Sequence, residues 1–220
     1  MGKRLGKEIP KAFVPINGKE LFLYSVEVFD AMSVFNEIII VVPSTAIEEA
    51  KQKTSNFSGK IIISEGGKER HNSVENGIKN ASGEIVLIHD AARPFITKEL
   101  VGNLLENYTK SGFSGVISAN PVVDTVRKTV ANNLEINLCG QTVNRDDLIA
   151  VGTPQVFDKK ILLDCFAKIE DSSLIPTDEA MLVQNFGYEV GWVKGSKLNF
   201  KVTTPEDIIL AEAVIGSQNV

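Results

Sequence analysis

The sequence predicts an α/β fold: a Rossmann-like, doubly wound and mainly parallel sheet from which a β-hairpin arm protrudes. Residues 37–43 (EIIIVVP) and 84–89 (EIVLIH) are short apolar runs rich in β-branched residues, typical of parallel strands that are buried on both faces. Apolar residues at helical spacing alternate with such runs. Because a sheet of this kind binds ligands beyond the carboxyl ends of its strands, we expect the functional residues in the loops that follow them.

The remaining predicted elements are three helices and two further strands. Two of the helices carry an apolar stripe, and Thr204 followed by Pro205 is typical of the start of the third. The helices cover residues 19–32, 100–108 and 204–211, and the strands cover 60–64 and 112–119. The alternation predicts one domain over residues 1–220. A helix in such a unit follows a strand, yet nothing strand-like precedes the first helix, so we expect the first strand of the sheet to be missing.

The overall charge excludes a general role in coating nucleic acids. The 23 Lys and Arg residues face 28 Asp and Glu residues, for a net charge of −5, so any anion site must use local basic clusters. The hydrophobic content of 43% is that of a globular protein with a sizeable core. We therefore expect no nucleic-acid partner.

The cysteines and histidines limit both the compartment and the metal chemistry. Cys139 and Cys165 are too few for a disulfide framework and lack the spacing of a metal site. There is neither a signal peptide nor a run of about 18 apolar residues, so we expect a cytoplasmic protein without a membrane partner. With only His71 and His89 in addition, carboxylates and a hard cation such as Mg²⁺ are the expected metal chemistry.

Residues 130–147 (VANNLEINLCGQTVNRDD) interrupt the alternation of strands and helices. Leu134, Ile136 and Leu138 recur with period two in a polar, Asn-rich segment, which predicts a β-hairpin. An exposed hairpin is marginal alone, so we expect it to pack against a partner. The alternative is an ordinary β excursion that covers its own sheet.

The first eleven residues, MGKRLGKEIPK, are strongly basic. Four cations face the single carboxylate of Glu8, and Gly2 and Gly6 allow backbone N–H groups to approach a ligand; the cations are Lys3, Arg4, Lys7 and Lys11. This composition indicates a loop that surrounds a phosphate chain, although a solvated basic terminus would also explain it. The GxxxxGK[ST] pattern of a P-loop is absent.

Two strand-exit segments carry further candidate residues. Asp90 directly follows the 84–89 run, where its carboxylate could hold Mg²⁺, and Arg93 could fix the loop or bind phosphate. A structural ion pair at the strand end would explain the same residues. Gly66 and Gly67, leading to Ser73, could bring the backbone close to a base or ribose, but a tight turn between strand and helix explains them equally well.

Eight motifs occur in one order along the chain: GKRLGKEIPK, GGKERHNSV, HDAARPF, PVVDTV, NRDDL, GTPQVF, PTDEA and FKVTTPEDI. Together they resemble the 2-C-methyl-D-erythritol 4-phosphate cytidylyltransferases over essentially the whole chain. The ribitol-5-phosphate cytidylyltransferases share the scaffold, but HDAARP and TDEA are more similar to the methylerythritol enzymes.

The resemblance implies transfer of CMP from CTP to 2-C-methyl-D-erythritol 4-phosphate with release of pyrophosphate, in non-mevalonate isoprenoid biosynthesis, with Mg²⁺. It implies that Arg4, Lys11 and Lys201 neutralise the α-phosphate. The implied CTP-binding residues are Gly2, Lys3, Gly66, Gly67, Ser73, Asp90 and Ala91, with Asp90 also near the metal. The implied acceptor-binding residues are Thr125, Arg145, Thr153 and Thr177. Arg145 would come from the exchanged arm, 130–147, of the second subunit.

The chain departs from the family pattern at its first residue. Family members begin with a hydrophobic strand that leads to an Ala-Ala-Gly element, and Met1 follows directly where that element would end. We expect a misassigned start codon or a truncated chain, with poor stability and weak activity if these residues are all of it. A catalytically inactive nucleotide-binding protein is therefore a second hypothesis, beside a ribitol-5-phosphate enzyme. A dinucleotide-dependent oxidoreductase is excluded because no GxGxxG follows a first strand.

Overall fold

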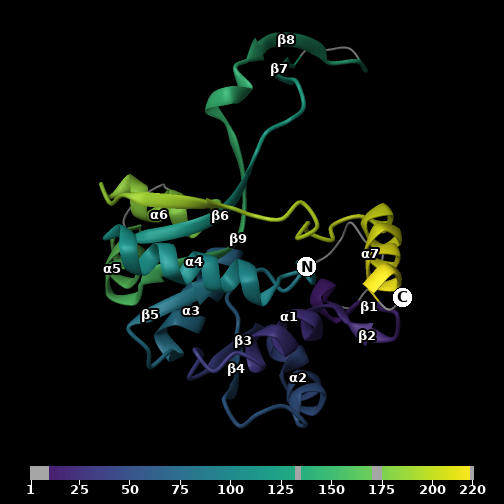
Figure 1. The fold of residues 1–220 in the computed structure, drawn as a ribbon, viewed down its shortest axis with the longest axis vertical. Helices are drawn as coiled ribbons and strands as arrows, with labels where there is room; N and C mark the ends of the chain where they lie inside the picture. The colour runs from purple at the N-terminus through teal and green to yellow at the C-terminus, as the bar shows by residue number, and fades with distance from the viewer. Residues whose placement is uncertain (1–9, 132–134, 170–174, 219–220) are drawn as a thin grey trace.

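The structure, a computed structural model, describes residues 10–131, 135–169 and 175–218. They form a body of strands and helices from which one β-hairpin projects (Figure 1). The strands are β1 (Pro15–Ile16), β2 (Lys19–Glu20), β3 (Ile38–Val42), β4 (Ile61–Glu65), β5 (Ile85–Ile88), β6 (Gly115–Pro121), β7 (Val126–Val130), β8 (Leu138–Val143), β9 (Ile149–Asp158) and β10 (Val190–Lys194). The helices are α1 (Leu21–Asp30), α2 (Ile47–Thr54), α3 (Arg70–Asn80), α4 (Lys98–Ser111), α5 (Lys159–Ile169), α6 (Glu179–Asn185) and α7 (Pro205–Gln218), with short 3₁₀ helices η2 (Lys11–Phe13), η3 (Ser44–Ala46) and η4 (Arg145–Asp147). Every strand and helix of the body that the sequence predicts is present.

The strands of the body form two groups. Four strands make a sheet in the order β10-β6-β9-β5, and β3 with β4 makes a separate parallel pair. Strand β9 runs antiparallel to both β5 and β6, whereas β10 runs parallel to β6. Strands β5, β6 and β10 therefore share one direction, which confirms the mainly parallel sheet. The reversed strand, β9, is the one that returns from the arm.

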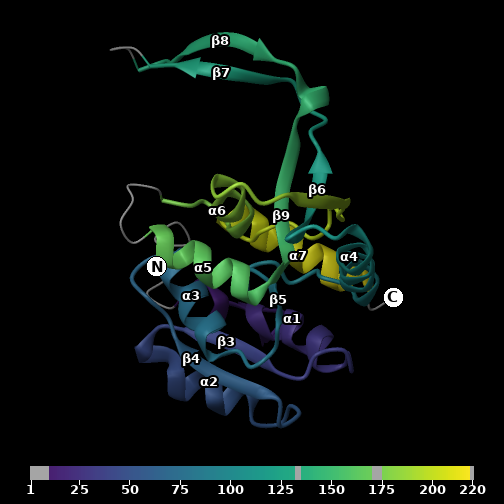
Figure 2. The ribbon, with the colours of Figure 1, turned by 90° about the vertical axis from the view of Figure 1, so that its left-hand side faces the viewer.

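Helices cover both faces of the sheet. Val86 of β5 belongs to a core cluster with residues of α3, α5 and α6, whereas its neighbour Leu87 packs against a cluster formed in part by α1 and α4. Because successive side chains of a strand point to opposite faces, the two sets of helices lie on opposite sides of the sheet, as Figure 2 shows. This arrangement confirms the doubly wound class.

A small hairpin precedes α1 and was not predicted. Strands β1 and β2 pair antiparallel through a turn at Asn17 and Gly18, whose φ values are 48° and 78°. Positive φ at both central residues is what a two-residue hairpin turn of type I′ requires, and Asn-Gly is its strongest sequence signal. The flanking strands have only two residues each, too few for a visible period. This hairpin belongs to neither strand group of the body.

The arm consists of β7 and β8, which pair antiparallel from Val126↔Val143 to Val130↔Leu138 and stand well above the body (Figure 1). The hairpin was predicted over 130–147, so its first strand begins earlier along the chain. That strand reads VRKTV and is largely exposed. Because neither face is buried, the sequence shows no apolar alternation there. Residues 132–134, including the Leu134 used in the prediction, lie outside the described residues.

Candidate functional site

Asp90 lies at the carboxyl end of β5, where three cations surround its carboxylate. Lys201 Nζ is 2.8 Å from Oδ2, Arg70 Nε is 3.3 Å from Oδ1, and Arg93 Nε is 3.8 Å from Oδ2. Burial alone would raise the pKa of the Asp90 carboxyl, but the charges of Arg70 and Lys201 outweigh it and hold the pKa at about 2. The carboxylate is therefore ionised throughout the physiological range.

Arg70 is held from its other side by Glu179. Arg70 Nη1 and Nη2 donate to the two carboxylate oxygens of Glu179 at 2.7 and 3.1 Å, a bidentate pair between the first residues of α3 and α6. Glu179 is only 2% exposed, and burial raises the pKa of its carboxyl although the Arg70 charge opposes that rise. Glu179 thus fixes the guanidinium whose Nε reaches Asp90.

The ionic cluster carries an excess of positive charge. Arg70, Arg93 and Lys201 supply three positive charges, whereas Asp90 and Glu179 supply at most two negative charges. In an acidic protein of net charge −5, this makes the strand-exit edge a local attractor for anions. A lone divalent cation is disfavoured there unless a bound anion accompanies it.

Buried hydrogen bonds fix the turn that carries Asp90. The Asp90 backbone N–H donates to Thr153 Oγ1 at 3.0 Å, and His89 contacts Thr153 Oγ1 through Nδ1 at 3.1 Å and the Arg93 carbonyl through Nε2 at 2.9 Å. Since a carbonyl only accepts, Nε2 carries the ring proton and Nδ1 accepts from the Thr153 hydroxyl. Burial lowers the pKa of His89 to about 4, so the ring is neutral at pH 7. His89 is therefore a structural residue of the turn.

These bonds change the interpretation of Thr153. The resemblance places it at the acceptor phosphate, but the side chain is only 3% exposed and its one hydroxyl proton is used by His89. A phosphate needs donors, so the Thr153 hydroxyl cannot serve one while it holds the ring. In this structure Thr153 positions the Asp90 turn.

The segment before α7 brings Lys201 to that turn. Val202 N–H donates to the Ala92 carbonyl at 2.8 Å, and Arg93 Nη1 donates to the Asn199 carbonyl at 2.9 Å. Asn199 Nδ2 in turn donates to the Thr153 carbonyl at 2.8 Å. Residues far apart in the sequence are therefore joined by backbone contacts on both sides of Lys201, and its position does not depend on its ion pair alone.

The glycine turn after β4 borders a cavity of about 290 Å³ beside Arg70. Gly67 N–H donates to Ser73 Oγ at 3.0 Å, and a Cβ at Gly67 would lie 2.4 Å from Asn72 Cβ. The turn is thus tight enough to require glycine at position 67. From the sequence alone, a glycine needed for a tight turn could not be distinguished from a glycine needed for close approach of a ligand. Gly66, Gly67 and Ser73 all line the cavity, and their contact with a ligand stays a prediction.

The basic loop is described only at its end. Gly2, Lys3 and Arg4 lie outside the described residues. Lys11 begins η2, and Phe13 of the same short helix belongs to the core cluster against which Ala91 packs. The segment of Lys11 and the Asp90 turn therefore both contribute to this one core cluster.

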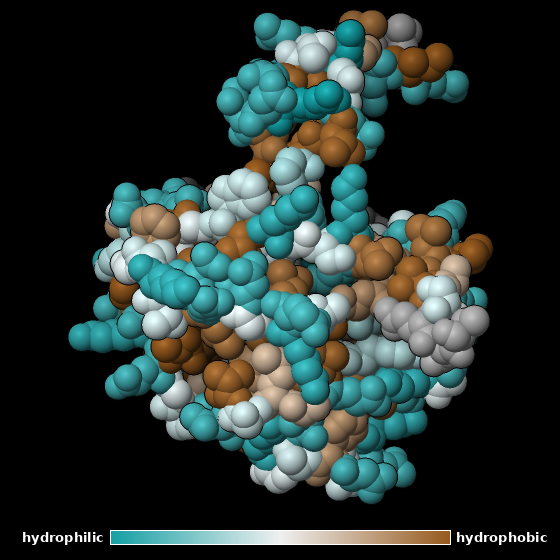
Figure 3. Space-filling view, in the orientation of Figure 1, coloured by the Kyte–Doolittle hydropathy of each residue, from teal (hydrophilic) through white to brown (hydrophobic). Residues whose placement is uncertain are grey.

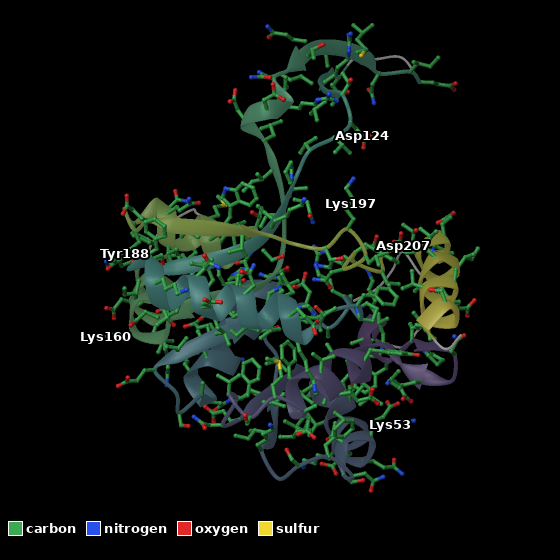
Figure 4. The ribbon with its side chains drawn as sticks, in the orientation of Figure 1. Lys53, Asp124, Lys160, Tyr188, Lys197 and Asp207 are labelled. Atoms are coloured by element: carbon green, nitrogen blue, oxygen red, sulfur yellow. The ribbon has the colours of Figure 1, made fainter. Side chains whose placement is uncertain are left out.

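The other acceptor residues do not all meet at Asp90 within one chain. Arg145 donates through Nη1 to the Val123 carbonyl at the base of the arm, beside exposed Thr125. Figure 4 shows the neighbouring Asp124 on the arm, well above the sheet. Thr177 lies just before α6, where its hydroxyl donates to Met181 Sδ at 3.5 Å. The next residue, Asp178, accepts a 2.9 Å hydrogen bond from Gln155 Nε2 of β9, which ties this segment to the sheet. Thr177 thus belongs to the body, whereas Thr125 and Arg145 belong to the arm.

Two residues of the cluster, Arg70 and Glu179, were not singled out from the sequence. Both stand inside quoted motifs, GGKER and PTDEA, but 109 positions separate them and neither motif indicates a partner. The available signal was an acidic residue at the start of an apolar helix, which is ordinarily a solvated cap.

A family model for 2-C-methyl-D-erythritol 4-phosphate cytidylyltransferase matches residues 1–217. The chain belongs to this family. Among relatives of the same description, that of Alkaliphilus metalliredigens is 38% identical over 224 residues, which is 99% of this chain and 90% of the relative. That of Alkaliphilus oremlandii is 36% identical, over 99% of this chain and 92% of the relative.

Solved structures agree with this cytidylyltransferase membership. The 4-diphosphocytidyl-2C-methyl-D-erythritol synthase of Anaerococcus prevotii aligns with a TM-score of 0.85 at 28% identity, covering 97% of this chain and 93% of that one. The 2-C-methyl-D-erythritol 4-phosphate cytidylyltransferase of Thermus thermophilus aligns with a TM-score of 0.79 at 33% identity, covering 94% of each chain. The fold and the family predicted from the sequence are thus confirmed.

The described part of this cytidylyltransferase contains neither a preformed metal cluster nor a membrane-spanning helix. Within residues 10–131, 135–169 and 175–218, no three His, Cys, Asp or Glu side chains gather as a metal site would require. Across the same part of the chain, none of the helices combines the length and the apolar character needed to cross a bilayer.

Proposed function

We propose that this chain transfers CMP from CTP to 2-C-methyl-D-erythritol 4-phosphate and releases pyrophosphate. The observation that carries the proposal is the positive cluster around Asp90, at the sheet edge where a doubly wound fold binds its ligand. Family membership identifies the nucleotide and the acceptor that fit such a site. The same membership favours this acceptor over ribitol 5-phosphate and favours an enzyme over an inactive nucleotide-binding protein.

The reaction needs no nucleophilic side chain. A phosphate oxygen of the acceptor attacks the α-phosphorus of CTP in line, a new P–O bond forms, and the bond to the bridging oxygen of the departing pyrophosphate breaks. Catalysis then consists of positioning and charge neutralisation. Lys201 supplies one cation from the body, and Arg4 and Lys11 supply others from the basic loop.

The cavity beside the glycine turn suits the cytosine ring. Its backbone and the Ser73 hydroxyl offer donors and acceptors to the edge of a base, which is how a site discriminates between pyrimidines. Gly66 and Gly67 allow close approach, Asp90 and Ala91 lie toward the ribose, and Gly2 and Lys3 bind the phosphates. The acceptor phosphate is bound by Thr125, Arg145 and Thr177.

A divalent cation, Mg²⁺ or a similar ion, fits this site only together with CTP. Asp90 supplies one ionised carboxylate at the strand exit. Mg²⁺ is commonly bound by one or two carboxylates together with phosphate and water oxygens. When bound, such an ion would neutralise phosphate charge. Because Lys201 and Arg70 hold both Asp90 oxygens, we expect no measurable Mg²⁺ binding by calorimetry without nucleotide.

The arm is proposed to pair with that of a second copy in a homodimer. Its exposed apolar residues include Val130, Ile136 and Leu138, which one chain leaves in solvent. Arg145 and Thr125 would then reach the acceptor phosphate bound at the partner's Asp90 cluster. The cytoplasmic location is supported by Cys139 and Cys165, which are both free thiols.

A pyrophosphate-release assay with CTP, Mg²⁺ and the methylerythritol phosphate tests the function. Turnover with this acceptor, and at least tenfold less with ribitol 5-phosphate, is the expected result. Faster turnover with ribitol 5-phosphate would reassign the acceptor. CTP binding in calorimetry without turnover on either acceptor would instead support an inactive nucleotide-binding protein.

A further inference from the structure

A buried carboxylate joins the starts of two helices of the body. Of the charged residues that the structure describes, Glu179 alone is buried, at 2% exposure, although hydrophilic side chains are spread over the face of the molecule in Figure 3. Both of its oxygens accept from Arg70, which stands 109 positions earlier in the chain. A buried ion pair often adds little net stability compared with apolar side chains of similar volume, so stability alone does not explain its place.

Arg70, the first residue of α3, stands on the side of the site proposed for the nucleotide. It lines the cavity of about 290 Å³ together with Gly67 and Ser73. Ser73 Oγ accepts from Gly67 N–H at 3.0 Å and donates to the Glu69 carbonyl at 3.1 Å, so the glycine turn and the first turn of α3 are tied together. A displacement of Arg70 would therefore displace the wall of this cavity.

Glu179, the first residue of α6, stands on the side proposed for the acceptor. Thr177 lies two residues before it, and Asp178 is the N-cap of the helix. Asp178 Oδ1 accepts from Met181 N–H at 2.9 Å, and Asp178 Oδ2 accepts from Gln155 Nε2 at 2.9 Å. One carboxylate thus holds the segment of Thr177 and the start of α6 together against β9.

The Arg70 guanidinium extends this link to Asp90. Its two Nη atoms donate to Glu179, and its Nε lies 3.3 Å from Asp90 Oδ1. Lys201 holds the other Asp90 oxygen at 2.8 Å. Because Lys201 is proposed to bind the α-phosphate, CTP would draw its ammonium group away from Asp90. The carboxylate would then be oriented by Arg93 and, at the shorter distance, by Arg70.

We propose that Glu179 is a positioning residue for cytidylyl transfer, acting through Arg70 to link the acceptor segment to the nucleotide cavity. The inference rests on the proposed function, because it takes the acceptor at Thr177 and the nucleotide at the glycine turn. CTP transfers the orientation of Asp90 from Lys201 to Arg70, whose place Glu179 sets, and this fixes the acceptor segment. Such a coupling is reciprocal, so each substrate should bind about tenfold more tightly when the other is present.

Calorimetry with an unreactive nucleotide measures the coupling in the presence of Mg²⁺. The probe is the CTP analogue with a methylene group between the α- and β-phosphates, which cannot release pyrophosphate, and the acceptor is 2-C-methyl-D-erythritol 4-phosphate. We expect the acceptor to lower the Kd of the analogue about tenfold in the unaltered chain. In Glu179→Gln this ratio should fall to about one, because Gln keeps the shape of Glu179 but offers Arg70 one acceptor oxygen instead of two. The Kd of the analogue alone should change little.

Two further variants complete the calorimetric comparison. Glu106→Gln is the matched control, since it makes the same change at an exposed residue of α4 that pairs with Lys110, and it should keep the ratio of the unaltered chain. Glu179→Asp decides if Glu179→Gln does not fold. It keeps the negative charge beside Arg70 but is one methylene group shorter, so it cannot hold both Nη atoms at the observed distances, and the ratio should again fall.

Steady-state kinetics separates positioning from stability. Glu179→Gln should lower kcat about tenfold and raise the KM for the acceptor, because the acceptor segment is no longer fixed relative to CTP. The KM for CTP should change little, since the nucleotide keeps its own contacts. A purely structural role would instead reduce the amount of folded enzyme, which lowers kcat and leaves both KM values and the calorimetric ratio unchanged.

Three results would overturn the inference. They are a ratio near one in the unaltered chain, an unaltered ratio in Glu179→Gln (or in Glu179→Asp, where Glu179→Gln does not fold), and a loss of kcat that matches the loss of folded enzyme. If the analogue does not bind the unaltered chain at all, the proposed function fails and this inference fails with it. Binding of both substrates without coupling would overturn this inference alone.

Discussion

The turn at Asp90 and the β7/β8 arm show two ways in which this chain places functional side chains. At the turn, Asp90 contacts Arg70, Arg93 and Lys201, and its backbone bonds to buried Thr153, so its position is determined within one chain. On the arm, the strands are largely exposed, and Arg145 donates to the Val123 carbonyl at the base of the same arm. Side chains of the body are thus fixed by buried contacts, whereas those of the exposed hairpin depend on the proposed pairing with a second copy.

The largest expected effect is the loss of the body cation. Lys201→Ala should lower kcat about 10²–10³-fold, because one preorganised charge contact to the transition state is lost. The melting temperature should change little, since backbone bonds at Val202 and Asn199 hold the segment. Steady-state kinetics with differential scanning calorimetry measures both. Lys160→Ala, at an exposed position of α5 (Figure 4), is the control and should match the unaltered enzyme. A kcat loss fully explained by unfolding would contradict the assignment.

The second prediction tests whether the arm acts across subunits. Arg145→Ala and Lys201→Ala should each be nearly inactive alone. Mixed at equal amounts and allowed to exchange, half of the dimers would contain one of each chain, and each of those would hold one intact site. We expect recovery of about a quarter of the original activity, given random pairing in a two-fold dimer. Mixtures that stay as inactive as the parent proteins would exclude arm exchange.

The third prediction concerns the stability of the turn. Glu179→Ala removes the buried partner of Arg70 and should cost about 2–3 kcal/mol of unfolding free energy, below the usual range for a broken buried pair because the Arg70 side chain is 34% exposed. Urea titration measures this loss. Glu106→Ala, which removes an exposed i,i+4 pair with Lys110, serves as the control and should leave the urea midpoint unchanged. Equal midpoints for the two variants would mean that the Arg70–Glu179 pair contributes nothing.

The effect that is smallest at neutral pH is a pH dependence from His89. Its folded pKa of about 4 lies below the ordinary value of 6.5, so between these values the unfolded chain binds a proton that the folded chain does not. Unfolding free energy should therefore fall as the pH drops from about 6.5 toward 4. Asp90, with its pKa lowered to about 2, should lose its contribution only below about pH 4. In His89→Gln, urea midpoints should be nearly flat between pH 4.5 and 6.5; an unchanged slope would assign the effect elsewhere.

The same contrast explains what could be predicted from sequence. Buried strands such as β3 and β5 can be predicted from the sequence because both of their faces require apolar residues. The position of the turn at Asp90 follows from where β5 ends. Strand β7 gives no such pattern, since solvent on both faces imposes no alternation. The Arg70–Glu179 pair has no local signature, because an ion pair between two helix starts depends on how the helices pack.

Cys139 lies exposed on β8, whereas Cys165 is fully buried in α5 and burial raises the pKa of its thiol. A thiol-directed reagent should therefore modify the arm alone, because Cys139 is accessible, whereas Cys165 is buried and its raised pKa keeps it protonated. The native sequence thus already contains a single attachment point for a fluorophore or spin label on its most protruding element. Distances between labelled arms could be followed in solution without any engineered residue.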